Sequence, residues 1–129
     1  MKNHRRTPPL WRAWVEMQLD TPAAARMLEE RELSVDFVRQ VASAEAGLAR
    51  YGSVHVQTPV LADLLQAPVE EVTRARLALV HLKVVVYTRG DDGTLARDLD
   101  LPLVLRPGRK LPPALEVALE QLPPDEWDR

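Results

Sequence analysis

The chain has 129 residues, enough for one domain with a small hydrophobic core. Its apolar share of 46% and charged share of 28% are typical of a globular protein, and its few aromatic residues predict a mainly aliphatic core. The absence of cysteine excludes a disulfide framework and a thiolate zinc site. The sequence starts without the apolar run of a signal peptide and nowhere approaches the roughly 18 apolar residues of a transmembrane helix. We therefore expect a cytoplasmic protein with no membrane partner.

The net charge of −2 is distributed unevenly along the chain. Basic side chains dominate residues 1–14 and slightly exceed acidic ones in 50–110, whereas acidic side chains dominate 15–49 and 111–129. This asymmetry fits one basic binding face with acidic flanks, and it fits a solvated surface without a partner equally well.

The N-terminal part of the chain predicts two helices. Thr7-Pro8-Pro9 should end a basic tail over residues 1–9, and the apolar spacing then predicts a helix over 10–19. A second, short helix is expected over 23–31, because Thr21 can cap it and Pro22 suits a first helical position.

A third helix is predicted after Ser34, which can cap it, and should end near Gly52. Residues 53–57 alternate weakly and predict a short strand. The apolar line of the helix recurs at steps of three and four: Val35, Val38, Val41, Ala42, Leu48 and Ala49.

Two short helices joined by a tight turn are predicted next. The first runs from Thr58 to Gln66, Ala67 forms the turn, and the second runs from Pro68 to about Lys83. The buried line of the second helix is expected to contain Val72, Ala75 or Arg76, Leu79 and Leu82. Its outer side would then carry Glu70, Thr73, Arg74, Leu77 and His81.

A β-hairpin and a final helix complete the prediction. Residues 84–88 are rich in β-branched side chains, 89–93 contain the glycines of a hairpin turn, and 94–99 return as a second strand. Residues 101–107 should be extended, and 112–122 should form an amphipathic helix before an acidic tail. The expected fold is mainly α with a small β-hairpin.

The stretch from Leu61 to Ala75, LADLLQAPVEEVTRA, resembles the paired helices of winged helix-turn-helix DNA-binding proteins. These include MarR-like and GntR-like transcriptional regulators and the initiator domains of phage and plasmid replication. The resemblance covers about 40 residues. It implies a winged helix-turn-helix domain over residues 10–107, with N-terminal helices, followed by a C-terminal helix and acidic tail over 108–129.

In that family the second helix lies in the major groove of double-stranded DNA, and the wing contacts the adjacent backbone or minor groove. The resemblance therefore implies a set of DNA contacts: Thr58, Val69, Glu70, Thr73 and Arg74 from the helices, and Arg89, Thr94 and Arg97 from the wing. Two residues depart from the usual pattern. Gln66 and Lys83 stand where such proteins often have glycine.

Glu70 and Glu71 place two negative charges at the start of the helix expected to approach phosphates. Acidic residues in a first turn complement the helix dipole, by about 0.3 to 1 kcal/mol, whatever the helix does. A glutamate can also accept a hydrogen bond from cytosine N4.

No pattern in the sequence predicts an enzyme, a cofactor or a metal site. His4, His55 and His81 are far apart and have no companion at ligand spacing. Asp91 and Asp92 suit a turn, and Asp98 and Asp100 suit one face of a strand in water.

Two functions remain after this reasoning. The first is a DNA-binding protein, either a transcriptional regulator or a replication or plasmid-maintenance factor. The second is a winged-helix module that docks a protein partner, which the acidic segments 15–49 and 111–129 favour. A homodimer is a separate expectation, because winged helices that read palindromes need two-fold symmetry.

Overall fold

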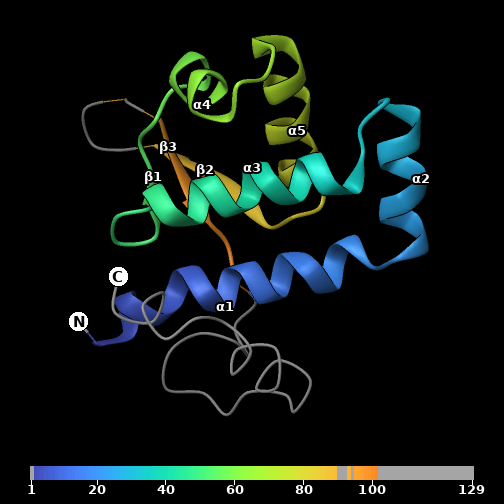
Figure 1. Cartoon of the computed structure of the whole chain (residues 1–129). Coiled ribbons are helices and arrows are strands. Elements are labelled where there is room, and N and C mark those ends of the chain that lie inside the picture. Colours follow the sequence, from blue (N-terminus) through green and yellow to red (C-terminus); the bar gives the residue numbers. More distant parts are fainter. Residues whose placement is uncertain (1, 90–92, 94, 102–129) are drawn as a thin grey trace.

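The structure, a computed structural model, describes residues 2–89, 93 and 95–101; of residues 2–8 only the backbone is described. Within these residues the chain forms helices and a small antiparallel sheet (Figure 1). The helices are α1 (Lys2–Leu19), α2 (Pro22–Glu30), α3 (Val35–Leu48), α4 (Thr58–Leu65) and α5 (Val69–His81). The strands are β1 (Ser53–Val54), β2 (Val85–Arg89) and β3 (Leu95–Leu99). The predicted C-terminal helix over 112–122 lies outside the described residues.

The starts of α2 and α3 confirm the predicted caps. The Thr21 hydroxyl accepts a hydrogen bond from the Ala24 N–H at 3.2 Å, and the Ser34 hydroxyl accepts one from the Phe37 N–H at 3.0 Å. Each bond satisfies a backbone donor that the first helical turn leaves unpaired.

Helix α1 begins earlier than predicted, at Lys2 rather than Leu10. The prediction treated Pro8 and Pro9 as a break, because proline lacks the N–H that an interior helical position donates. The fixed φ of proline is nevertheless compatible with helical geometry, and the helix continues through both residues.

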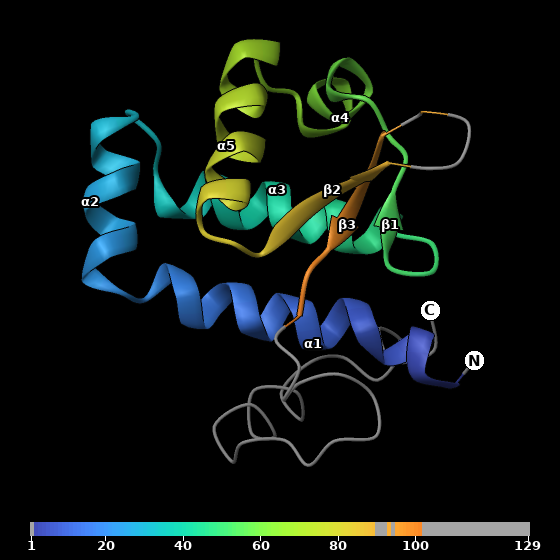
Figure 2. The same ribbon diagram turned by 180° about the vertical axis from the view of Figure 1, so that it is seen from behind.

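Helix α3 lies at the centre of the fold. Helix α1 runs antiparallel beside it on one side, and α4 and α5 pack on the other (Figures 1 and 2). Helix α2 connects α1 to α3 at one end of the molecule. The largest buried side chains come from several elements and meet around α3, including Trp11, Leu28, Val41, Leu61 and Leu79.

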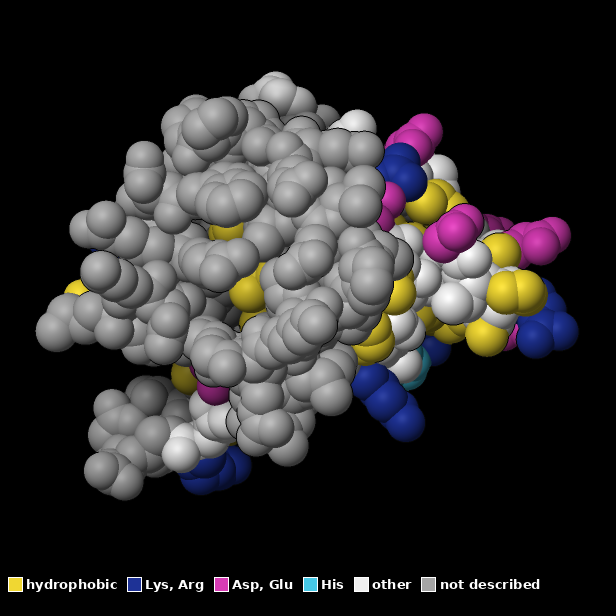
Figure 3. All heavy atoms as spheres, turned by 90° about the horizontal axis from the view of Figure 1, so that it is seen from below, with side chains coloured by type: hydrophobic (Ala, Val, Ile, Leu, Met, Phe, Trp, Pro, Cys, Tyr) yellow, Lys and Arg dark blue, Asp and Glu magenta, His cyan; other side chains and the backbone are white. Residues whose placement is uncertain are grey.

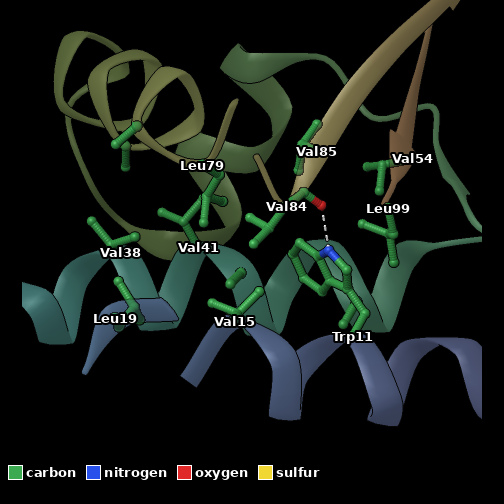
Figure 4. Close-up of a cluster of buried hydrophobic side chains, with 14 of the residues drawn as sticks. Trp11, Val15, Leu19, Val38, Val41, Val54, Leu79, Val84, Val85 and Leu99 are labelled. Atoms are coloured by element: carbon green, nitrogen blue, oxygen red, sulfur yellow. Dashed lines mark hydrogen bonds between the residues drawn. The ribbon is translucent and has the colours of Figure 1, made fainter. Parts of the chain in front are cut away.

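The sheet has strand order β1-β3-β2, so β3, the last of the described strands along the chain, is the central one. Ser53 pairs with Asp98, and Val85 pairs with Leu99. Strand β1 is shorter than the predicted 53–57. Trp11 ties α1 to the start of β2, because its indole N–H donates to the Val84 carbonyl at 2.5 Å (Figure 4).

Candidate functional site

Helices α4 and α5 are joined by a turn that needs a left-handed backbone. Gln66 has a φ of 53° and ends α4, and its side-chain amide donates to the Asp63 carbonyl at 2.9 Å. Lys83, after α5, has a φ of 64°. Both residues stand where glycine is common in winged helices, and both adopt the geometry that favours glycine.

The outer face of α5 is exposed as the periodicity predicted. Glu70, Thr73, Arg74 and His81 are exposed, and Leu77 retains 48% of its accessible surface. The inner face is formed by Val72, Ala75, Arg76, Ala78 and Leu79, all of them buried. The helix therefore offers one polar face with an apolar residue within it.

Two of these side chains are held by neighbours. The Thr73 hydroxyl donates to the Val69 carbonyl one turn earlier, at 2.8 Å, so a partner could contact its methyl group or donate to its oxygen. Arg74 donates from Nη1 to the Arg31 carbonyl at 2.7 Å, which holds the guanidinium near the end of α2. The Arg31 side chain in turn contacts His81, so the side chains of two arginines, Arg31 and Arg74, lie beside α5.

Charges are distributed unevenly along α5. Glu70 and Glu71 occupy the first turn, where they complement the helix dipole. Arg74 near the middle of the helix and Lys83 beyond its end are the exposed cations that follow. A phosphate backbone would therefore be attracted to the middle and the C-terminal end of the helix rather than to its start.

Charges of both signs lie next to one another at the α2 end of the molecule. Seen from the α1 side, the coloured side chains at the α2 end mix Lys and Arg with Asp and Glu (Figure 3). One exposed example is Arg39, which contacts Glu16 and Asp36, each at 2.6 Å.

The predicted wing residues have different environments. Arg89 is exposed at the end of β2, and Gly93 in the hairpin turn has a φ of +85°. Thr94 lies outside the described residues. Arg97, on β3, is only 3% exposed, so we remove it from the set of candidate DNA contacts.

Arg97 belongs instead to a buried charge cluster, which we define as Glu45, Arg76 and Arg97. Its Nε and Nη2 donate to the two carboxylate oxygens of Glu45 at 2.5 and 2.8 Å, a bidentate pair. Nη2 also donates to the Arg76 carbonyl at 3.1 Å, and Nη1 donates to the Tyr87 hydroxyl at 3.0 Å. The Arg97 guanidinium also lies over the Tyr87 ring, 5.6 Å from its centroid.

Arg76 completes the buried charge cluster from α5. Its Nη2 donates to Glu45 at 3.2 Å and to the Val56 carbonyl at 3.0 Å. Its Nη1 donates to the Thr58 hydroxyl at 3.0 Å. The N-cap position of α4 is Gln57, and the hydroxyl of Thr58, one of the residues expected to contact DNA, accepts this bond from Arg76. The cluster joins α3, α5, β3 and the segment before α4.

Burial acts to lower the pKa of Arg97, but the hydrogen bonds and negative charge of Glu45 outweigh it, and the pKa is raised above its ordinary value. Stability gained from a raised pKa is lost only as the pH rises through that pKa. Arg97 therefore remains cationic over the whole working range of pH.

The sequence analysis did not predict that Glu45 is buried, and it left open whether Ala75 or Arg76 lies on the buried side of α5. A signal was present in the spacing, because the apolar line of α3 has a gap between Ala42 and Leu48, and position 45 falls on that line. Long charged residues are almost never fully buried unless they are paired. The pairing itself depends on tertiary contacts between positions 31 and 52 residues apart.

Among the described residues, no group of three or more His, Asp or Glu side chains is arranged to hold a metal ion. No described helix is long and apolar enough to cross a membrane. No protein-family model, curated protein or solved structure matches the chain.

Proposed function

We propose that residues 35–99 form a winged helix-turn-helix and that the protein binds double-stranded DNA through the exposed face of α5, as a transcriptional regulator. The order of elements from α3 to β3 supports this proposal most strongly: helix, short strand, two helices and a hairpin, with β3 between β1 and β2. In a winged helix this order presents the second helix of the pair to the major groove and the hairpin to the backbone.

The exposed face of α5 offers suitable groups for both kinds of contact. Arg74 carries a charge that can meet a phosphate, and Glu70 can accept from cytosine N4. Val69 and the Thr73 methyl group can contact a thymine methyl group. Arg89, at the end of β2, is the described wing cation that we assign to the backbone, and Thr94 stays a prediction.

Fluorescence anisotropy of a labelled duplex tests the proposal. We expect non-specific binding with a Kd of about 10⁻⁴ to 10⁻⁶ M, weakening as salt is added because counterions are released. Arg74→Gln should weaken binding and make the salt slope shallower by about 0.9, the contribution of one phosphate contact. No binding at low salt would overturn the proposal.

Arg39→Gln provides the matched control, since it removes the same charge from an exposed arginine on the α1 side of α3, away from α5. It should leave the salt slope unchanged. Equal losses from both variants would mean that only net charge matters, and α5 would not be the contact face.

A homodimer is part of the same proposal, because a two-fold axis would allow two copies to read a palindromic site. Sedimentation equilibrium measures the mass directly. A monomer at every concentration tested would reject this part while leaving DNA binding by a single copy intact.

Protein docking is a second candidate, supported by apolar side chains on the surface of α4 and α5. Val60 and Leu64 retain 55% and 59% of their accessible surface, and Val69 and Leu77 retain 46% and 48%. Nuclease-treated lysate discriminates the two functions. A partner held by the native chain and lost with Leu64→Ser, in a variant whose DNA affinity is unchanged, would favour docking.

A further inference from the structure

A hollow of about 390 Å³ lies between the segment leading into α4 and the residues of β2 and β3. Its volume is near the lower end of the range for small-molecule sites, about 300 to 1,000 Å³. Its polar lining consists of His55, Gln57, Thr58, Arg76, Tyr87 and Arg97. The hollow therefore adjoins the buried charge cluster.

The buried charge cluster has an excess of positive charge. Two guanidinium groups, with side chains 8% and 3% exposed, share the carboxylate of Glu45, which is fully buried. A buried charge without a counter-charge is costly, because the low-dielectric interior does not replace its hydration. An anion entering the hollow would neutralise this excess.

Two of the residues that line the hollow have hydrogen-bond donors that remain to be used. The Nε of Arg76 is buried and has no partner within the part of the chain that the structure describes. The Tyr87 hydroxyl accepts a bond from Arg97, so its own proton is available to donate. Guanidinium groups suit oxyanions, because their N–H groups match the geometry of carboxylate and phosphate oxygens.

The remaining lining is apolar. Val54, Pro59 and Leu95 border the hollow, together with the ring of Tyr87. Binding sites of this kind combine apolar walls with a few polar groups that fix the orientation of the ligand. A bare inorganic anion would leave these apolar walls in contact with water.

We propose that this hollow binds a small molecule that carries a carboxylate or phosphate group on an apolar body. The oxyanion would meet Arg76, Arg97 and the Tyr87 hydroxyl, and the apolar body would lie against Val54, Pro59 and Leu95. This site is distinct from the exposed face of α5, and binding there does not require that the protein bind DNA.

The test uses the full-length protein alone, with three probes observed by NMR: phenyl phosphate, inorganic phosphate and phenol. Phenyl phosphate carries both parts of the expected ligand, and the other two carry one part each. We expect saturable shifts of the Arg76 Nε–H resonance, with phenyl phosphate binding at least about tenfold more tightly than either partial probe, equivalent to 1.4 kcal/mol. No saturable shift with phenyl phosphate up to about 10 mM would overturn the site, since a Kd of 1 mM corresponds to only −4.1 kcal/mol.

Three variants locate the binding. Arg76→Gln leaves Glu45 paired with Arg97 and removes the excess charge, and it should weaken phenyl phosphate binding about tenfold or more, as loss of a charged hydrogen bond does. Arg74→Gln is the matched control two positions away on the exposed face of α5, and it should change nothing. Equal affinity in the native protein and Arg76→Gln would contradict the proposal.

Tyr87→Phe keeps the half-exposed ring and removes only the hydroxyl, so it tests the site even if Arg76→Gln fails to fold. Loss of one hydrogen bond to the charged oxyanion should weaken phenyl phosphate binding about tenfold or more. An unchanged affinity in a folded Tyr87→Phe protein would also overturn the assignment.

Discussion

Arg74 and Arg76 stand two residues apart on α5 and have opposite environments. Two residues turn a helix by about 200°, so the two side chains point to nearly opposite faces. Arg74 is exposed and bonded to the Arg31 carbonyl, whereas Arg76 is 7% exposed and bonded to Glu45, Thr58 and the Val56 carbonyl. The same residue type thus belongs to the candidate binding face in one case and to the interior in the other.

This difference shows that the number of charged residues in a segment does not tell how many of them are exposed and able to contact a partner. A buried guanidinium needs a counter-charge and hydrogen bonds from its surroundings, so replacing it disturbs the fold. An exposed one contributes little to stability and is available for binding. Variants of the two regions should therefore separate stability from DNA affinity.

The largest effect is expected at Glu45. Glu45→Gln leaves two buried guanidinium groups without an anion, and the free energy of unfolding should fall by about 3 to 5 kcal/mol. Denaturant unfolding followed by tryptophan fluorescence measures it. Glu16→Gln, which breaks the exposed pair with Arg39, should cost no more than about 1 kcal/mol. Similar losses at both sites would mean that burial does not distinguish these pairs.

The next largest losses of stability are expected from replacing the two buried arginines, Arg76 and Arg97. Arg97→Gln removes the bidentate pair and should cost about 3 kcal/mol or more, because Glu45 retains only the 3.2 Å bond from Arg76. Arg76→Gln should cost less, because the bidentate pair survives. Unfolding curves of both variants give the order directly, and the reverse order would show that Arg76 is the principal partner of Glu45.

A smaller effect is expected at Thr58. Thr58→Val preserves the shape of the side chain and removes the oxygen that accepts from Arg76, which should cost about 1 kcal/mol. Thermal unfolding measures the change. Thr73→Val, whose hydroxyl is exposed, is the comparison, and equal effects would argue against a structural role for the Thr58 hydroxyl.

The smallest change in stability is expected at Arg74. Arg74→Gln should alter the free energy of unfolding by no more than about 0.5 kcal/mol, as for most surface substitutions. The measurement is again denaturant unfolding. A loss comparable to that of Arg76→Gln would show that the bond to the Arg31 carbonyl holds α2 in place, and Arg74 would then be a structural residue.

Much of the helical fold follows from local signals. The caps at Thr21 and Ser34 and the buried and exposed faces of α5 are as predicted, because they depend on side chains within one or two turns. The start of α1 differs from the prediction, because the helix continues through Pro8 and Pro9.

The site was less predictable, and for a physical reason. The resemblance implied that Arg97 is a wing cation that contacts DNA. Its burial follows from a tertiary contact, because the guanidinium on β3 is paired with Glu45 on α3. Spacing within a strand gives alternation but does not show whether a charged residue on the inner face has a partner. By contrast, helical periodicity alone predicted that Glu70, Thr73 and Arg74 are exposed.

The most direct test measures stability and DNA affinity together in Arg74→Gln and Arg76→Gln, under conditions in which both variants are folded. The account predicts that Arg74→Gln keeps its stability and loses DNA affinity with a shallower salt slope, whereas Arg76→Gln loses stability and keeps the salt slope of the native protein. The opposite pattern, or native DNA affinity in Arg74→Gln, would contradict it.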